Sequence, residues 1–266
     1  MATAGSTYLF NNAASQAHLQ MMLLAEILDG HTDEVLAEIG AGDDAHWRCL
    51  ELGPGAGSVA ATLLEVFDAE HVVAIDKDPR HIAARAGLEI QAGDIVDAEL
   101  GDSRYDLIHA RLLFMHLPQR EQVLTRAIAA LKPGGLIVVS DWDCTHPDEL
   151  LLTGGDELRD AFGSFQNALL TLGARLGMDA GWARRVPAVF AAAGLTDLGG
   201  LTYNRLWTGG QPGMQLHACN SRQLHRPLLD AGVSLPQLEL LRDGMQDPQV
   251  LGYLYPMYTT VGRRPS

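Results

Sequence analysis

One short stretch, Cys49–Ser58, constrains the fold more than any other part of the chain. An apolar run ends in an acid, Glu51, and is followed by glycines at alternate positions, Gly53, Gly55 and Gly57. Glycine allows positive φ and a close approach of the backbone to a ligand, and the unpaired first amides of a helix suit a negative group. The stretch therefore predicts a strand, a tight turn and a helix that bind a nucleotide-type cofactor.

Apolar runs and helical patterns alternate along the first 141 residues, which predicts a doubly wound α/β fold with a mostly parallel sheet. The expected strands are 47–52, 72–76, 88–91, 105–109 and 136–141. The expected helices are 13–29, ended by Gly30, then 32–39, 58–69, 78–86 and 118–131. Ligands of such sheets bind at the carboxyl ends of the strands. Acids are expected to converge there: Glu51, Asp76, Asp94 and Asp141.

The second half of the chain has a less regular pattern. Helices are expected over 156–177, 180–193, 214–231 and 235–245, and strands over 196–207 and 257–263. There is no internal repeat and no low-complexity linker. We therefore expect one domain over 1–266, made of a helical lead (1–40), a cofactor-binding core (45–143) and two cap segments (145–178 and 208–248).

Charge and composition narrow the function. The net charge is −14, and an acidic surface repels phosphate backbones, so a nucleic-acid substrate is not expected. The beginning of the sequence has no signal-peptide pattern, no run is long enough to span a bilayer, and the cysteines have no close pairing, so we expect a cytoplasmic protein. We expect no metal site, because His109 and His116 have no acid or cysteine pair at ligand spacing.

Two classes of cofactor fit the glycine turn. The residues from Gly55 to Ala60 match the dinucleotide pattern G-x-G-x-x-A, with Asp76 at the distance of a ribose-binding acid, which keeps an NAD(P)-dependent oxidoreductase open. The run Glu51-Leu-Gly-Pro-Gly-Ala-Gly57 also resembles the first motif of the class I S-adenosylmethionine-dependent methyltransferases of small-molecule type. Further matching motifs follow in order: Ile75-Asp76, Ala92-Gly93-Asp94-Ile95, the run from Tyr105 to Arg111 with His116-Leu117-Pro118, Leu131-Lys-Pro-Gly-Gly135 and, weakly, Val261-Gly262-Arg263-Arg264.

This resemblance implies a Rossmann-like sheet of seven strands with the last strand antiparallel, a helical cap, and S-adenosylmethionine as cofactor. It implies that Asp76 accepts hydrogen bonds from the ribose, that Asp94 and the Ile95 amide bind adenine, and that Glu51 lies near the methionine ammonium. It also places other residues at the cofactor: Tyr8 folding over it, Gly53, Gly55 and Gly57 beneath it, and Lys77, Gly93, Ala110 and Arg111 beside it. Each acid has a simpler alternative as a helix cap or turn former, and Tyr8 as a packing aromatic.

Another motif is misleading. The residues from Val139 to Thr145 look like the D-x-D-x-T nucleophile motif of haloacid-dehalogenase-type phosphatases, but that family needs a downstream lysine, and none follows Lys132. Asp141 and Asp143, with His146, are instead expected to line the substrate pocket, or to cap loops.

The expected reaction is methyl transfer to a small, partly hydrophobic or aromatic acceptor on O, N or C, by a monomer or homodimer, in a setting such as bacterial secondary metabolism. Such a displacement needs an in-line geometry, and a base only if the acceptor must lose a proton. His116 is the candidate base; its alternative is a packing or helix-start histidine. A protein that binds S-adenosylmethionine without transferring methyl also stays open.

Overall fold

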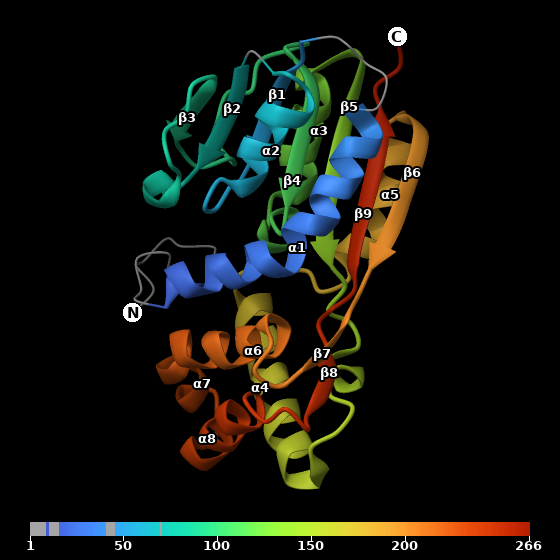
Figure 1. Cartoon of the computed structure of the whole chain (residues 1–266). Coiled ribbons are helices and arrows are strands. Elements are labelled where there is room, and N and C mark those ends of the chain that lie inside the picture. Colours follow the sequence, from blue (N-terminus) through green and yellow to red (C-terminus); the bar gives the residue numbers. More distant parts are fainter. Residues whose placement is uncertain (1–8, 11–15, 41–45, 70) are drawn as a thin grey trace.

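The computed structural model describes residues 9–10, 16–40, 46–69 and 71–266. Its centre is a seven-stranded sheet with the strand order β3-β2-β1-β4-β5-β9-β6 (Figure 1). The strands are β1 (Arg48–Leu52), β2 (His71–Asp76), β3 (Leu88–Ala92), β4 (Tyr105–Arg111), β5 (Leu131–Trp142), β6 (Thr196–Tyr203) and β9 (Met257–Arg263). Strand β9 runs antiparallel to both of its neighbours, β5 and β6, and the other strand pairs of this sheet are parallel. The predicted doubly wound sheet with an antiparallel last strand is confirmed.

Helices cover both faces of this sheet. Figure 1 shows α1 and α2 on one face and α3 and α5 on the other. The helices around the sheet are α1 (Ala17–Gly40), α2 (Ser58–Val66), α3 (Arg120–Ala130) and α5 (Trp182–Ala192), with short 3₁₀ turns η1 (Pro79–His81), η2 (Phe114–His116) and η3 (Pro147–Glu149). Strand side chains alternate between the faces: Leu50 and Leu52 belong to one buried cluster and Cys49 to the other.

A cap covers the end of the sheet at which the parallel strands finish. It consists of α4 (Gly155–Arg175), α6 (Pro212–Gln223), α7 (His225–Asp230), α8 (Leu235–Gly244), β7 (Leu206–Thr208) and β8 (Leu251–Tyr253). The first half of α1 lies between cap and sheet (Figure 1), where Gln20 Nε2 donates to Asn220 Oδ1 of α6 at 2.8 Å. None of the described helices combines the length and the apolar character needed to cross a bilayer.

Two helix predictions were wrong. Gly30 does not end a helix, since α1 continues to Gly40: the buried residues Ile27, His31 and Val35 keep one stripe packed against the protein, and this packing overrides the low helix propensity of glycine. The helix expected over 78–86 is only the turn η1, because residues 83–86 are exposed and have no apolar stripe to bury.

The bounds of other helices and strands also differ from the expected ones. The strand expected over 196–207 is split between β6 and β7, which belong to different sheets. The helix expected over 214–231 is divided into α6 and α7 at Leu224. Strand β5 starts at Leu131 rather than 136 and contains an irregularity, because its pairing with β4 jumps from Leu131 to Leu136. The two-residue turn at Gly134–Gly135 thus lies within the strand.

Candidate active site

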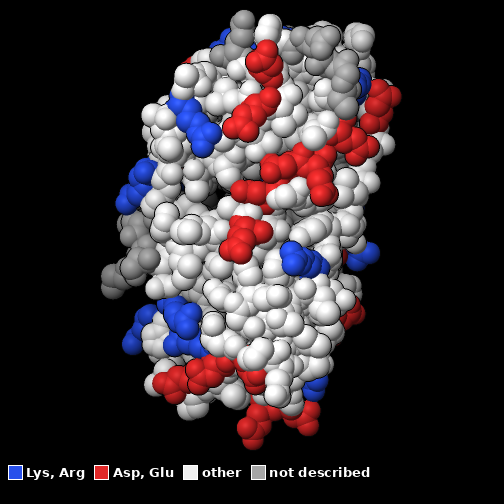
Figure 2. Space-filling model, viewed as in Figure 1, with Lys and Arg blue, Asp and Glu red and all other residues white. Residues whose placement is uncertain are grey.

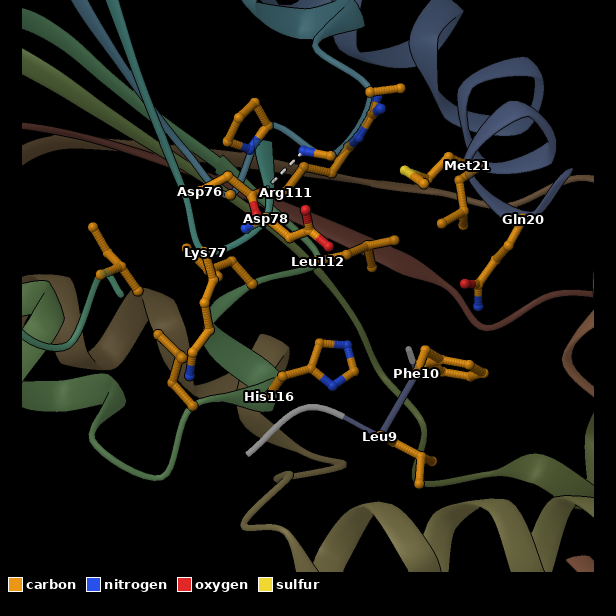
Figure 3. A pocket seen from close by; sticks show the side chains of 18 of the residues that line it. Leu9, Phe10, Gln20, Met21, Asp76, Lys77, Asp78, Arg111, Leu112 and His116 are labelled. Atoms are coloured by element: carbon orange, nitrogen blue, oxygen red, sulfur yellow. Dashed lines mark hydrogen bonds between the residues drawn. The ribbon is translucent and has the colours of Figure 1, made fainter. Parts of the chain in front are cut away.

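A cavity of about 970 Å³ lies between the carboxyl ends of β1, β2 and β4 and the cap (Figure 3). Of the predicted cofactor residues, those that line it are Glu51, Gly53, Gly55, Asp76, Lys77, Gly93, Asp94, Ile95 and Arg111. Tyr8 lies outside the described residues, and Gly57 and Ala110 are not part of the wall. The structure therefore brings together nine side chains or backbones that come from four separate strand ends.

The glycine turn joins β1 to α2 in a conformation that suits glycine. Gly55 has φ +57°, and a Cβ atom there would meet nothing within 4 Å, so the backbone faces open cavity. Gly57 has φ +85°, precedes α2 as its N-cap, and a Cβ atom there would lie 2.9 Å from Ile82 Cγ2. Gly55 thus exposes backbone to a ligand, whereas Gly57 allows close packing behind the turn.

Asp76 at the end of β2 is held by backbone amides. The Gly55 N–H donates to Oδ2 at 3.3 Å (dashed in Figure 3) and the Asp78 N–H donates to Oδ1 at 2.8 Å. These bonds tie the acid to the glycine turn and leave carboxylate lone pairs for a ligand, because two oxygens offer about four acceptor positions.

Asp94 after β3 pairs with Lys77. Lys77 Nζ lies 2.7 Å from Asp94 Oδ2, and the Val96 N–H donates to Oδ1 at 3.0 Å. Burial alone would raise the pKa of Asp94, but the hydrogen bonds from Lys77 and Val96, together with the lysine charge, hold that pKa below its usual value. The carboxylate is therefore ionised and accepts hydrogen bonds throughout the physiological pH range.

Glu51 on β1 forms a buried pair with His109 of β4. The two residues are register partners in the sheet, and His109 Nδ1 lies 2.7 Å from Glu51 Oε2, with side-chain exposures of 0% and 2%. A carboxylate only accepts hydrogen bonds, so Nδ1 is the donor. The buried Nε2 of His109 has no partner among the described residues. The pair fixes a carboxylate at the cavity wall. In the sequence, His109 belongs to the run from Tyr105 to Arg111 and lacks partners at metal-ligand spacing, and nothing there marks it as the partner of Glu51.

Arg111 at the end of β4 fastens α1 to the site. Its guanidinium donates to Asp29 Oδ1 and to Thr32 Oγ1, each at 2.8 Å. Asp29 also accepts from Ser58 Oγ at 3.1 Å, at the start of α2. Neighbouring Ala110 is 1% exposed and belongs to the core. Arg111 therefore joins three elements around the glycine turn.

His116, the candidate base, lies where two cavities meet. Its ring points into the open space toward Phe10 and Gln20 (Figure 3). It also lines a smaller adjoining cavity of about 80 Å³ with a mainly apolar wall. Burial, with a smaller contribution from the charge of Arg120, lowers the pKa of His116 to about 4. The imidazole is therefore neutral near pH 7.

The three residues predicted for the substrate pocket do not line either cavity. Asp141 is 1% exposed and accepts from the Met115 N–H at 3.2 Å, and burial raises its pKa to about 8 despite that bond. Asp143 accepts from Thr145 Oγ1 at 2.7 Å and lies 3.5 Å from Arg184. His146 is exposed at the start of η3. Of the two interpretations left open for the aspartates, this geometry is that of loop supports.

Several parts of the cavity wall had no signal in the sequence analysis. The N-terminal half of α1 contributes Gln20, Met21, Leu24 and Ala25, and the cap contributes Leu172, Arg175, Leu176 and residues 223–227. Their spacing resembles ordinary amphipathic helix, so only the tertiary contact reveals them. Among the described residues no three His, Cys, Asp or Glu side chains gather in a way that could hold a metal ion.

A sheet of this order with an antiparallel β9, a glycine turn after β1, and acids at the next strand ends defines a methyltransferase-type α/β protein. A family model described as a methyltransferase domain matches residues 24–179, more than half of the 266 residues. The chain belongs to this methyltransferase family, whose cofactor is S-adenosylmethionine, as the motifs predicted.

Curated relatives are also methyltransferases, and a solved structure shares the fold. Methyltransferase str3 of Strobilurus tenacellus is 30% identical over 121 residues, 44% of this chain and 42% of that protein. The tRNA1(Val) (adenine(37)-N6)-methyltransferase of Porphyromonas gingivalis is 32% identical over 154 residues, 48% of this chain and 60% of that protein. The chain thus matches less than two thirds of either relative. Phosphoethanolamine N-methyltransferase 2 of Haemonchus contortus shares the fold, with a TM-score of 0.59, 14% identity, and coverage of 95% of this chain and 58% of that one.

Proposed function

We propose that the protein transfers a methyl group from S-adenosylmethionine to a small acceptor with an apolar part. The single observation that carries this proposal is the junction at His116. There the large cavity, walled by the glycine turn and the strand-end acids, meets the small apolar cavity. A donor and an acceptor bound in these two spaces would meet beside one side chain.

The residues of the larger space fit the chemical groups of the cofactor. Asp76 offers carboxylate lone pairs suited to the two ribose hydroxyls, and ionised Asp94 with the Ile95 amide suits the adenine edge. Glu51 offers a carboxylate to the methionine ammonium, and Gly55 leaves the backbone open beneath the ligand. Lys77 and Arg111 are engaged with Asp94 and Asp29, so we assign them to hold these acids and α1 in place.

The smaller space suits an apolar acceptor. Its walls include Leu169 and Leu170 of α4, Met115, Trp142 and Phe10. The polar groups at its edge include the pair Gln20–Asn220 and Tyr255, whose hydroxyl donates to Gln166 Oε1 at 2.7 Å. An aromatic ring or short aliphatic chain would bury its apolar surface there, and burial contributes roughly 25 cal/mol per Å².

The chemistry requires little beyond positioning. S-adenosylmethionine, when bound, supplies an electrophilic methyl group. The chain's own residues hold the acceptor and exclude water. Holding the two reactants in the right orientation can by itself accelerate the reaction strongly. Neutral His116 can accept a hydrogen bond from an acceptor hydroxyl or amine and orient its lone pair. Because a pKa of about 4 makes a weak base, we assign His116 mainly to orientation.

A nucleic-acid acceptor is the competing candidate, because one relative acts on tRNA by its name. The net charge of −14 opposes it.

The three cysteines, Cys49, Cys144 and Cys219, are free and buried, which supports a reducing compartment such as the cytoplasm.

The test is calorimetry with S-adenosylhomocysteine, with NADH as the control ligand, followed by mass spectrometry of methylated products from a small-molecule panel and from bulk tRNA. We expect the homocysteine product to bind and NADH not to bind. Binding of NADH alone, or methylation of tRNA alone, would refute the proposal. Tight binding with no methyl transfer to any acceptor would favour a non-transferring binder.

A further inference from the structure

The cap wall of the large cavity carries the opposite charge to the sheet wall. The acids that line the cavity come from the sheet side: Glu51, Asp76, Asp78 and Asp94. The cap residues that line it come from the end of α4 and the α6–α7 junction, and the ionisable ones are Arg175, His225 and Arg226. No Asp or Glu from the described part of the cap lines the cavity. In a chain with 33 acidic and 19 basic residues, the cap wall is a local reversal of sign.

Arg175 is the cation available to such a ligand. It lies in the last turn of α4, and within the described ranges no carboxylate comes within ion-pair distance of it. By contrast, Arg226 pairs with Asp230 at 3.0 Å, and Arg159 near the start of α4 pairs with Asp156 at 3.1 Å. A position at a helix C-terminus favours a basic residue, and Arg175 is exposed where it lines the cavity, so its hydrated guanidinium is accessible to an anion that enters there.

His225 adds a hydrogen-bond donor that is held in place. Arg242 donates to His225 Nδ1 at 3.1 Å, and also to Ser221 Oγ at 3.0 Å and Ser221 O at 2.9 Å. A guanidinium has no acceptor, so Nδ1 must accept and the ring proton lies on Nε2. Arg242 thus sets the tautomer of His225 and leaves Nε2–H as the donor not engaged by Arg242.

Figure 2 shows the same arrangement on the surface. A group of Lys and Arg side chains (blue) lies on the part of the cap where α6 and α7 are found in Figure 1, while carboxylates (red) lie over the half that contains the sheet and at the lower end of the cap. An anionic ligand would be repelled by much of the acidic surface, and the basic group offers it a local attraction on the cap.

We propose that the methyl acceptor carries an anionic oxygen group, a carboxylate or a phosphate, bound by Arg175 and His225 on the cap wall of the large cavity, with its apolar part extending past His116 into the small cavity. This inference rests on the proposed function and names the substrate class of the same site. Charge-assisted hydrogen bonds from Arg to carboxylate or phosphate are strong and geometrically specific, so the anion would fix the orientation of the acceptor for transfer.

The test compares matched acceptors on the whole chain with S-adenosylmethionine. The probes are hydroxybenzoates and aminobenzoates, the corresponding primary amides, and the corresponding aryl phosphates, each followed by mass spectrometry of the methylated product. We expect the wild type to prefer one anionic series over the amides by at least about 10-fold in kcat/KM. Preference for benzoates or for aryl phosphates identifies which anion is recognised.

Arg175→Gln tests the assigned residue, and Arg159→Gln on the same helix is the matched control. Arg175→Gln should raise KM for the preferred anion about 10- to 100-fold, abolish the preference over amides, and leave the affinity for S-adenosylhomocysteine unchanged. Arg159→Gln should change none of these. Thermal unfolding checks that each variant is folded.

Four outcomes would overturn this inference and leave the proposed function intact. With the wild type, they are methylation of the amides as well as the anions, or a methyl ester of the anionic group as product. With Arg175→Gln, they are a retained preference for the anion, or weaker S-adenosylhomocysteine binding, which would assign Arg175 to the cofactor carboxylate. If the wild type binds no S-adenosylhomocysteine or methylates nothing in any series, the proposed function fails first and this inference falls with it.

Discussion

Glu51→Gln is the perturbation that separates the charge of Glu51 from its structural role. Glutamine keeps an oxygen that accepts from His109 Nδ1, so the buried contact of 2.7 Å can persist, while the negative charge is lost. If Glu51 faces the methionine ammonium, the variant loses an interaction that exists only with ligands carrying that ammonium.

The structure sets the expected magnitude. The Glu51 side chain is 2% exposed, so water does not replace a lost partner as it would at the surface. A hydrogen bond to a charged group contributes about 1.5–3 kcal/mol, and at 1.36 kcal/mol per tenfold change this corresponds to about 10- to 150-fold in affinity. We therefore expect Glu51→Gln to weaken S-adenosylhomocysteine binding by that factor.

The assay is calorimetry with a pair of ligands. S-adenosylhomocysteine has the ammonium, whereas 5′-methylthioadenosine has the same adenosine and lacks it. Affinity for 5′-methylthioadenosine should stay within about twofold, because it depends on the acids assigned to ribose and adenine. Glu65→Gln is the matched control, since it makes the same charge change on α2 at a side chain that is 78% exposed.

Equal weakening of both ligands would refute the reasoning, because it would show that Glu51 acts through the shape of the glycine turn. Unchanged affinity for both would place the ammonium elsewhere. A large loss in Glu65→Gln would mean that overall charge, rather than a local contact, governs binding.

Other predictions follow from single residues. Asp76→Ala should weaken S-adenosylhomocysteine binding by about 1–3 kcal/mol in calorimetry. Unchanged affinity would show that the ribose does not bind at Asp76. Gly57→Ala should lower the free energy of unfolding by at least about 1–2 kcal/mol, because of its positive φ and the clash with Ile82, and urea denaturation showing no loss would contradict this. The folded pKa of Asp141, about 8, exceeds the ordinary 3.8, so the wild type loses stability as pH rises from 5 to 8. Asp141→Asn does not titrate and should therefore become more stable relative to the wild type across that window. A difference in Tm that does not depend on pH would contradict this. His116→Ala should lower turnover without changing cofactor affinity, and the wild-type rate should show no titration of His116 between pH 6 and 8, since its pKa is about 4.

The cofactor side of the fold was predictable because its signals are local. Gly55, Asp76 and Asp94 each follow an apolar strand within a few residues, and parallel strands bring their carboxyl ends to one edge. The same rule failed for Asp141. Strand β5 continues to Trp142, and the turn η2 closes over the carboxylate, which the Met115 amide binds.

The acceptor side was not predictable because its walls join distant parts of the chain. Gln20 and Asn220 are 200 residues apart and meet at the wall of the small cavity. The unpaired state of Arg175 is likewise a property of tertiary packing, because an arginine at the end of a helix has the same sequence pattern whether or not an acid lies nearby. Gly30 was misjudged for a related reason, since burial of His31 and Val35 carries the helix past it.

The place of β9 in the sheet has a consequence for folding kinetics. This strand lies between β5 and β6, and in the sheet β6 pairs with β9 alone. During synthesis β6 is made before β9, with the whole α6–α8 part of the cap between them, so β6 has no strand to join until the ribosome has passed residue 263. Closing so long a loop delays the pairing. We expect the sheet to be completed as a late step, with the exposed edge of β5 a target for chaperones until β9 inserts.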